Sequence, residues 1–126
     1  MRLYPQNIDI KTLSPLALAF VGDGVFSLMV RERLVCEANR AAGKLHKLSV
    51  EQVRAEGQAG AARRILPLLT EKETAVFRRG RNAHTTRNSD EYHLATGLEA
   101  LFGYLYLRDE QERLRALFEL GMRSEE

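Results

Sequence analysis

The longest apolar stretch of the chain, residues 16–30, contains a single charged side chain, Asp23, and this pattern restricts the folds that the chain can adopt. Ser14 and Pro15 stand before the stretch as an N-cap and first-turn pair, and no helix breaker follows until about Glu37. The pattern therefore predicts one long helix. Because this helix is apolar on nearly every face, we expect it to lie at the centre of the domain with neighbours on all sides.

A second apolar stretch, residues 94–107, also carries one acid, Glu99. An ionised carboxylate in apolar surroundings loses several kcal/mol of hydration unless a positive or hydrogen-bonding group replaces the water. Two such acids on two core helices suggest a shared cation, and Mg²⁺ binds through one or two carboxylates while keeping several waters. The alternative is that Asp23 and Glu99 each pair with a core arginine or cap a backbone, and spacing alone leaves both readings open.

Glycines surround both acids. Gly22 and Gly24 flank Asp23, and Gly97 lies two residues before Glu99. An interior glycine costs a helix about 1 kcal/mol relative to alanine, so these positions indicate that another helix backbone or a substrate phosphate approaches the acids closely. Metal-assisted hydrolysis of a phosphodiester is then the natural reaction class.

The rest of the chain shows helical patterns and no strand pattern. Capping-box spacing occurs at residues 70–73 and again at 109–112, and Asp90 is placed to cap the helix that contains Glu99. The further helices expected are 45–62, a short helix or turn over 63–69, 71–82, 91–107 and a last helix that starts after residue 109. These patterns predict an all-α fold, with residues 1–126 forming a single domain of about six or seven helices around a central apolar helix.

Length and composition agree with one globular domain, since 44% of the 126 residues are apolar. The longest nearly uninterrupted apolar run, residues 16–26, is far shorter than the roughly 20 residues that a membrane span needs, so we expect no membrane association. The single cysteine, Cys36, cannot form an intramolecular disulfide, which fits a reducing compartment. We therefore expect a cytoplasmic protein.

Basic residues are concentrated in one segment although the net charge is only +2. Residues 78–87 contain four arginines and one histidine and no acid. Such a cluster is typical of a polyanion-binding surface. The dipole of a preceding helix would by itself favour Arg78 and Arg79 at its C-terminus, but it does not explain Arg87.

Four segments together resemble one known family. Residues 20–25, Phe-Val-Gly-Asp-Gly-Val, resemble the signature helix of ribonuclease III domains, and residues 98–107 are similar to the second acidic helix of that family. Residues 79–83 and 45–48 are similar to the corresponding segments of Mini-ribonuclease III, the catalytic domain that stands without a double-stranded-RNA-binding domain. The resemblance covers nearly the whole chain and implies a ribonuclease III-like endonuclease domain.

The chain departs from the larger ribonuclease III pattern at two acidic positions. That pattern has a glutamate four residues before the aspartate and an aspartate three residues before the second glutamate, where this chain has Ala19 and Thr96. The site then keeps two of four carboxylates per subunit, and we expect it to bind metal more weakly than the four-acid site. Gly24 replaces the usual alanine or serine and leaves the helix slightly looser.

The resemblance implies a Mg²⁺-dependent endoribonuclease, with Mn²⁺ as a possible substitute, that cleaves double-stranded RNA. Asp23 and Glu99 would be both the catalytic and the metal-binding residues, and the cut would leave a 5′-phosphate and a 3′-hydroxyl. It also implies a homodimer whose two sites line one valley, and the precursor of large-subunit ribosomal RNA as the substrate.

A domain without an added RNA-binding module must bind the duplex with its own surface, and A-form RNA offers phosphates and 2′-hydroxyls to basic and polar side chains. Two other hypotheses remain open: a catalytically weak or inactive ribonuclease III-like dimer that binds double-stranded RNA, which the two missing acids suggest, and a purely helical dimerisation module. The predicted RNA-binding residues are Arg78, Arg79, Arg81, Asn82, His84 and Arg87, with Lys44 and His46 as weaker candidates.

Overall fold

The structure is a computed structural model in which residues 2–83 and 89–123 are described. These residues form six α-helices and two short 3₁₀ helices and contain no strand, so the predicted all-α class and helix number are confirmed. The elements are η1 (Ile10–Thr12), α1 (Pro15–Glu37), α2 (Ala42–Val53), α3 (Ala55–Ile65), η2 (Leu66–Leu68), α4 (Glu71–Arg81), α5 (Asp90–Leu107) and α6 (Gln111–Gly121).

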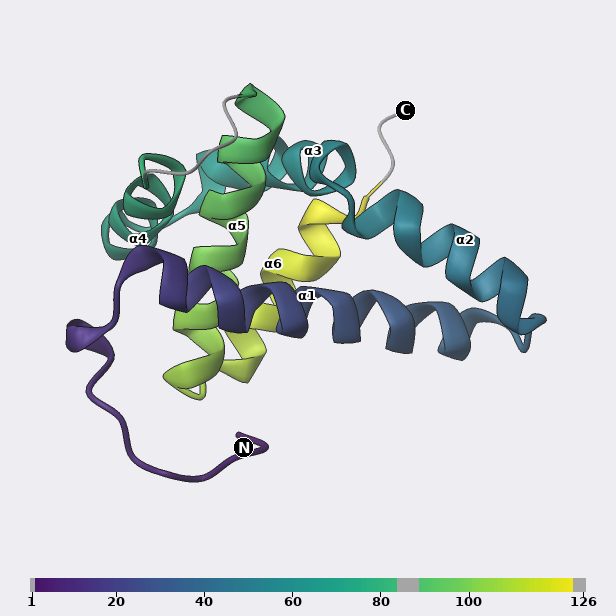
Figure 1. The fold of residues 1–126 in the computed structure, drawn as a ribbon, viewed down its shortest axis with the longest axis horizontal. Helices are drawn as coiled ribbons and strands as arrows, with labels where there is room; N and C mark the ends of the chain where they lie inside the picture. Colours follow the sequence, from purple (N-terminus) through teal and green to yellow (C-terminus); the bar gives the residue numbers. More distant parts are fainter. Residues whose placement is uncertain (1, 84–88, 124–126) are drawn as a thin grey trace.

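Helices α1 and α5 cross each other and organise the fold (Figure 1). Helix α2 folds back along the second half of α1, while α3, α4 and α6 pack around α5. Phe26 of α1 makes edge-to-face contacts with Phe102 of α5 at 5.6 Å and with Phe118 of α6 at 5.8 Å between ring centres. These three rings join the helices at the middle of the core.

The central apolar helix is α5 rather than α1. Ten residues of α5 are buried, against six of the longer α1. One face of α1 stays open: Phe20 is 83% exposed, Leu28 52% and Val35 60%. The expectation that α1 has neighbours on all sides is therefore wrong, because its apolar pattern exceeds what the domain itself covers.

The segment expected to form one helix over residues 45–62 forms two. Arg54 has an extended backbone (φ −68°, ψ 163°) that ends α2 and begins α3. The corner is tight, since a Cβ atom at Gly57 would lie 2.6 Å from the carbonyl oxygens of Glu51 and Gln52. The break lets α2 pack on α1 while α3 turns to pack on α5.

Helix starts agree with the sequence in two cases and differ in two. The Ser14 hydroxyl accepts from Ala17 N at 3.0 Å, and Thr70 and Glu73 form the predicted capping box of α4. Helix α5 is capped by Ser89 instead of Asp90, and α6 begins without a side-chain cap at all.

The second expected capping box fails because its first residue is used to end α5. Asp109 has a positive φ of 59°. Its N–H donates to Tyr106 O at 2.9 Å, and Glu110 N–H donates to Leu105 O at 2.9 Å. This is the Schellman arrangement that ends many helices, and it leaves Asp109 outside the first turn of α6.

No helix in the described part of the chain has the length and apolar character needed to cross a membrane.

Candidate active site

The backbones of α1 and α5 touch where they cross. A Cβ atom at Gly22 would collide with the carbonyl group of Glu99 and lie 2.7 Å from Gly103 N, and a Cβ atom at Gly103 would collide with the carbonyl group of Leu18. Side chains other than hydrogen would force the helices apart. The crossing therefore places Asp23, next to Gly22, directly beside Glu99.

The other two glycines near the acids have different settings. Gly97 faces α4, where a Cβ atom would lie 2.9 Å from the ring of Phe77, so the expected close approach is confirmed there as well. Gly24 faces open space, with no atom within 4 Å of an added Cβ. The domain itself thus explains Gly22 and Gly97 but not Gly24.

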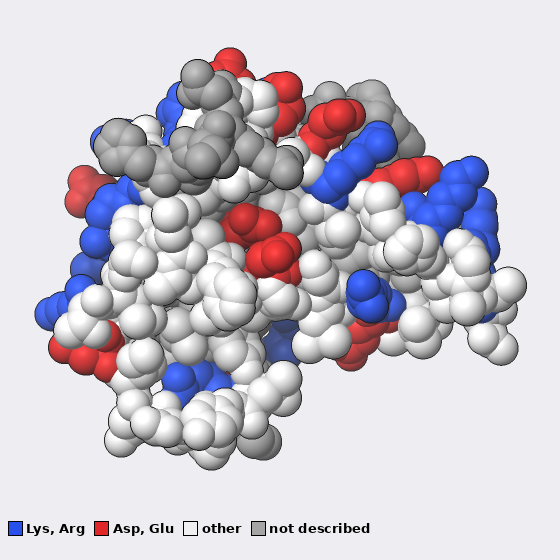
Figure 2. All heavy atoms as spheres, in the orientation of Figure 1, with Lys and Arg blue, Asp and Glu red and all other residues white. Residues whose placement is uncertain are grey.

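Asp23 and Glu99 form an acidic pair at this crossing. Burial, the negative charge of Asp23 and a hydrogen bond between the two carboxyl groups together raise the pKa of Glu99 from an ordinary value of 4.5 to about 8, and burial is the largest of these causes. Figure 2 shows acidic side chains gathered beside α5, above α1, with largely uncharged surface around them. Within the described part of the chain, no basic group is among those that shift the pKa of Glu99, so no arginine there pairs with this acid.

A third polar residue reaches the pair from α3. Gln58 is 1% exposed, and its side-chain amide acts on Glu99 in the opposite direction to burial, because it favours the ionised carboxylate and so lowers the pKa. Sequence reasoning missed this residue, since a glutamine in a polar helix usually faces solvent. The available signal was its position among small residues: Ala55, Gly57, Ala59 and Gly60 surround it in the sequence.

The two positions where the larger family has acids contribute no carboxylate here. Ala19 is buried, and Thr96 is buried with its hydroxyl donating to the backbone oxygen of Tyr92 at 2.9 Å. Within residues 2–83 and 89–123 there is no group of three or more acidic, histidine or cysteine side chains suited to a metal ion. The acidic side chains that meet at this crossing are thus Asp23 and Glu99.

The predicted RNA-binding residues lie on two separate elements. Arg78, Arg79 and Arg81 are exposed on the last turn of α4 and Asn82 follows them, whereas Lys44 and His46 are exposed on α2. Figure 1 places α4 and α2 on opposite sides of the α1–α5 crossing, and Figure 2 shows basic side chains at both edges of this face. His84 and Arg87 lie outside the described residues.

Comparisons with known proteins agree on one class. Residues 16–110 match the family profile of the Ribonuclease III domain. The chain is 47% identical to the Mini-ribonuclease 3 of Thermoanaerobacter sp. (strain X514), over 90% of this chain and 83% of the relative, and 48% identical to that of Synechococcus sp. (strain ATCC 27144), over 86% and 80%. The crystal structure of protein FN1578 from Fusobacterium nucleatum superposes with a TM-score of 0.81 at 29% identity, covering 90% of this chain and 94% of that one.

The fold, the acidic pair at the helix crossing and the profile match define a ribonuclease III-type domain. Within this class, the identities over most of both chains show that the protein belongs to the Mini-ribonuclease 3 family. The resemblance first seen in residues 20–25 and 98–107 is confirmed.

Proposed function

We propose that this protein is a metal-dependent endoribonuclease that cleaves double-stranded RNA. The observation that carries the proposal is the contact between Asp23 and Glu99, two acids on different helices. No basic group among residues 2–83 and 89–123 offsets their repulsion at Glu99. A fold does not keep such a pair for stability, because the charge of Asp23 disfavours ionisation of Glu99. Membership of the Mini-ribonuclease 3 family supports the same reaction.

The two carboxylates fit a hard divalent cation, and we propose Mg²⁺, with Mn²⁺ as a substitute. Such an ion takes one or two carboxylates, keeps several waters and accepts substrate phosphate oxygens. The chemistry supplied by a bound ion is charge stabilisation at the scissile phosphate and a more acidic attacking water, which gives 5′-phosphate and 3′-hydroxyl ends. Glu99 must lose its carboxyl proton before both side chains can act as ligands.

The basic residues on either side of the acidic pair would hold the RNA. Duplex RNA presents phosphates on both sides of its grooves, and the α4 cluster (Arg78, Arg79, Arg81, Asn82) and the α2 residues Lys44 and His46 flank the site. His84 and Arg87 belong to the same proposal on sequence grounds. We further propose the precursor of large-subunit ribosomal RNA as the substrate and the cytoplasm as the location, both of which rest on the family resemblance.

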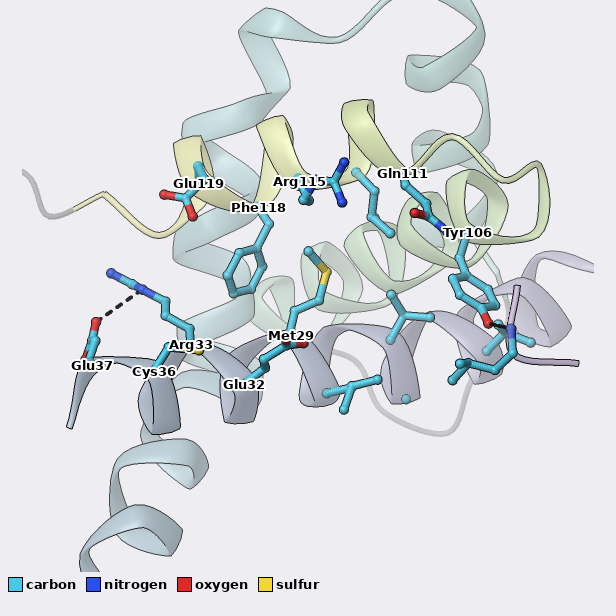
Figure 3. Close-up of a pocket in the computed structure, with 16 residues that line it drawn as sticks. Met29, Glu32, Arg33, Cys36, Glu37, Tyr106, Gln111, Arg115, Phe118 and Glu119 are labelled. Carbon is cyan, nitrogen blue, oxygen red and sulfur yellow. Dashed lines mark hydrogen bonds and ion pairs between the residues drawn. The ribbon is translucent and has the colours of Figure 1, made fainter. Parts of the chain in front are cut away.

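An open apolar groove supports a homodimer. A groove of about 950 Å³ lies between α1 and α6, with Leu28 and Met29 on one wall and Leu114 and Phe118 on the other. Figure 3 shows Met29 and Phe118 directed into it. The groove lies along the exposed apolar face of α1, which includes Phe20 and Val35. A large apolar surface of this kind does not stabilise a monomer in water and is typical of an interaction site. A second copy of the chain, packed across α1, would cover it and bring two acidic pairs to one face.

The first test is cleavage of a perfect RNA duplex with and without Mg²⁺. The protein should cut the duplex only with the metal, and end analysis should find 5′-phosphates. Asp23→Asn removes one ligand charge at an exposed position, so it should lower the cleavage rate at least about 100-fold while the fold and RNA binding persist. Undiminished cleavage by Asp23→Asn would refute the metal role of the pair.

The same test separates the second candidate, a domain that binds duplex RNA without cutting it. The observation that favours this alternative is the absence of acids at positions 19 and 96. Position 19 is alanine, and the hydroxyl group of Thr96 donates a hydrogen bond to Tyr92 O. It predicts binding of the duplex and no metal-dependent product from the unmodified protein.

A salt titration tests the α4 cluster. Each lost phosphate contact flattens the dependence of log K on log salt concentration by about one unit, so Arg81→Ala should weaken duplex binding and reduce the slope by that amount. Lys72→Ala is the matched control, because Lys72 is an exposed cation at the opposite end of the same helix. Equal slopes for the wild type and Arg81→Ala would remove this residue from the interface.

A further inference from the structure

Gln58 is an unusual side chain for the interior of this domain. The buried polar or charged residues in the described part of the chain are Ser49, Gln58, Glu73 and Thr96. Three of them have clear partners: Ser49 donates to His46 O at 2.9 Å, Thr96 donates to Tyr92 O at 2.9 Å, and Glu73 pairs with Arg113 at 2.8 Å. Gln58 Nε2 is fully buried and makes no hydrogen bond of ordinary geometry.

A buried donor without a hydrogen bond lowers stability by about 1–3 kcal/mol. An apolar side chain of the same length would avoid this loss, because the neighbours of Gln58 on α3 include Ala59, Ala61 and Ala62, all at most 1% exposed. The amide is better explained by the carboxyl group of Glu99, on which it acts.

The two groups are chemically matched when Glu99 is ionised. A primary amide carries two N–H donors, and an ionised carboxylate is a pure acceptor with room for several hydrogen bonds. Asp23 approaches the same carboxyl group from α1, so Glu99 lies between a repelling acid and a donor amide.

We propose that Gln58 is a positioning residue for Glu99: its Nε2–H donates to one oxygen of the ionised carboxylate and holds the other oxygen beside Asp23, ready to bind a divalent cation. The inference rests on the proposed function, since it concerns the same metal site. It adds a residue of a third helix, which would contact the ligand Glu99 and not the metal, to a site that has two acids. Hydrogen bonds of this kind orient ligating carboxylates, and their loss typically weakens metal binding 10–100-fold.

The test is calorimetric titration of Mg²⁺ and of Mn²⁺ into the protein without RNA. Gln58→Met keeps the length and removes both donors. We expect its metal dissociation constant to rise about 10–100-fold, while its thermal stability without metal equals or exceeds that of the wild type, because the unpaired donor is gone. In cleavage assays, kcat should recover at high metal concentration with an unchanged KM for RNA.

Gln52→Met is the matched control. Gln52 lies on α2, its Oε1 atom is also buried without a hydrogen bond, and it is not among the groups that act on Glu99. This variant should bind metal like the wild type. If Gln58→Met does not fold, Gln58→Asn serves instead, because it keeps the amide but withdraws it from Glu99 by one methylene, and the same loss of metal affinity is expected.

The outcomes distinguish the two proposals. Metal binding by Gln58→Met within twofold of the wild type, or equal losses in the Gln58 and Gln52 variants, would overturn the positioning role alone, provided that Asp23→Asn abolishes binding. Failure of the wild-type protein to bind Mg²⁺ or Mn²⁺, or no effect of Asp23→Asn on binding, would instead overturn the metal site on which the proposed function depends.

Discussion

At the scale of single residues, ionisation of Glu99 in the acidic pair lowers the stability of the folded protein. Glu99 has a pKa of about 8 in the folded protein against 4.5 for an ordinary glutamate. Between these values the folded state holds a proton that the unfolded chain has released, so the contribution of Glu99 to stability falls as pH rises from about 4.5 and is smallest above about 8. The site is thus least favourable to folding in the pH range where its carboxylates are ionised.

Glu99→Gln should reveal this cost. The neutral amide does not ionise, so the variant should gain stability over the wild type as pH rises, by about 1.4 kcal/mol for each unit of pKa difference that is realised. Urea unfolding at pH 5 and pH 9 in EDTA measures the effect. If the variant gains the same stability at both pH values, the gain does not come from the raised pKa of Glu99.

The sequence was sufficient to find Asp23 and Glu99, because a lone acid in an apolar helix is visible as a pattern. It was not sufficient to find Gln58. Whether a polar residue on a mixed helix faces water or the core depends on how that helix is turned, and the break at Arg54 that turns α3 toward α5 was not predicted.

At the scale of helices, the close crossing of α1 and α5 depends on glycine at positions 22 and 103. Gly22→Ala would push a methyl group into the carbonyl group of Glu99, so it should destabilise the fold by about 3 kcal/mol or more and separate the acidic pair. Gly24→Ala is the natural comparison two residues along the same helix. Its methyl group meets nothing within 4 Å, and the better helix propensity of alanine should raise stability by up to about 1 kcal/mol.

Chemical denaturation measures the change in unfolding free energy of Gly22→Ala and of Gly24→Ala. Opposite signs are expected, and a shift of both in the same direction would show that helix propensity, not the contact with α5, governs these positions.

Helix boundaries were predictable where local side chains cap the chain and unpredictable where distant packing decides. Ser14 and the Thr70–Glu73 box satisfy backbone groups within one turn, so their residues are readable from the sequence. The corner at Arg54 depends on how α2 and α3 meet different partners. The left-handed backbone at Asp109 depends on the way α5 ends, and no local sequence pattern predicted that ending.

At the scale of the whole molecule, the apolar pattern of α1 exceeds what one chain buries, and this surplus is the basis of the proposed dimer. Leu28→Asp places a charge on the exposed α1 face beside the groove. If a second copy covers this face, the buried unpaired charge should raise the dimer dissociation constant at least about 100-fold. Light scattering over a concentration series measures the mass. Val50→Asp, on an exposed apolar residue of α2 outside the groove, is the control.

Cys36 offers an independent readout, because it lines the same groove and is exposed in the single chain. A thiol reagent should modify Cys36 more slowly in the wild-type protein than in Leu28→Asp. A wild-type protein that scatters as a monomer, with labelling as fast as in the variant, would refute the dimer.

The contact of Gly22 with Glu99 has a consequence for engineering the protein. Main-chain atoms of α1 and α5 meet at this crossing, so the spacing of the two helices that carry the acids does not depend on the exposed side chains of α4 and α2. Under the proposed function, exchange of the arginines on α4 and of Lys44 on α2 should alter which RNA is bound, while the spacing of α1 and α5 is kept. Libraries aimed at new target preferences should randomise those borders and leave the glycine crossing untouched.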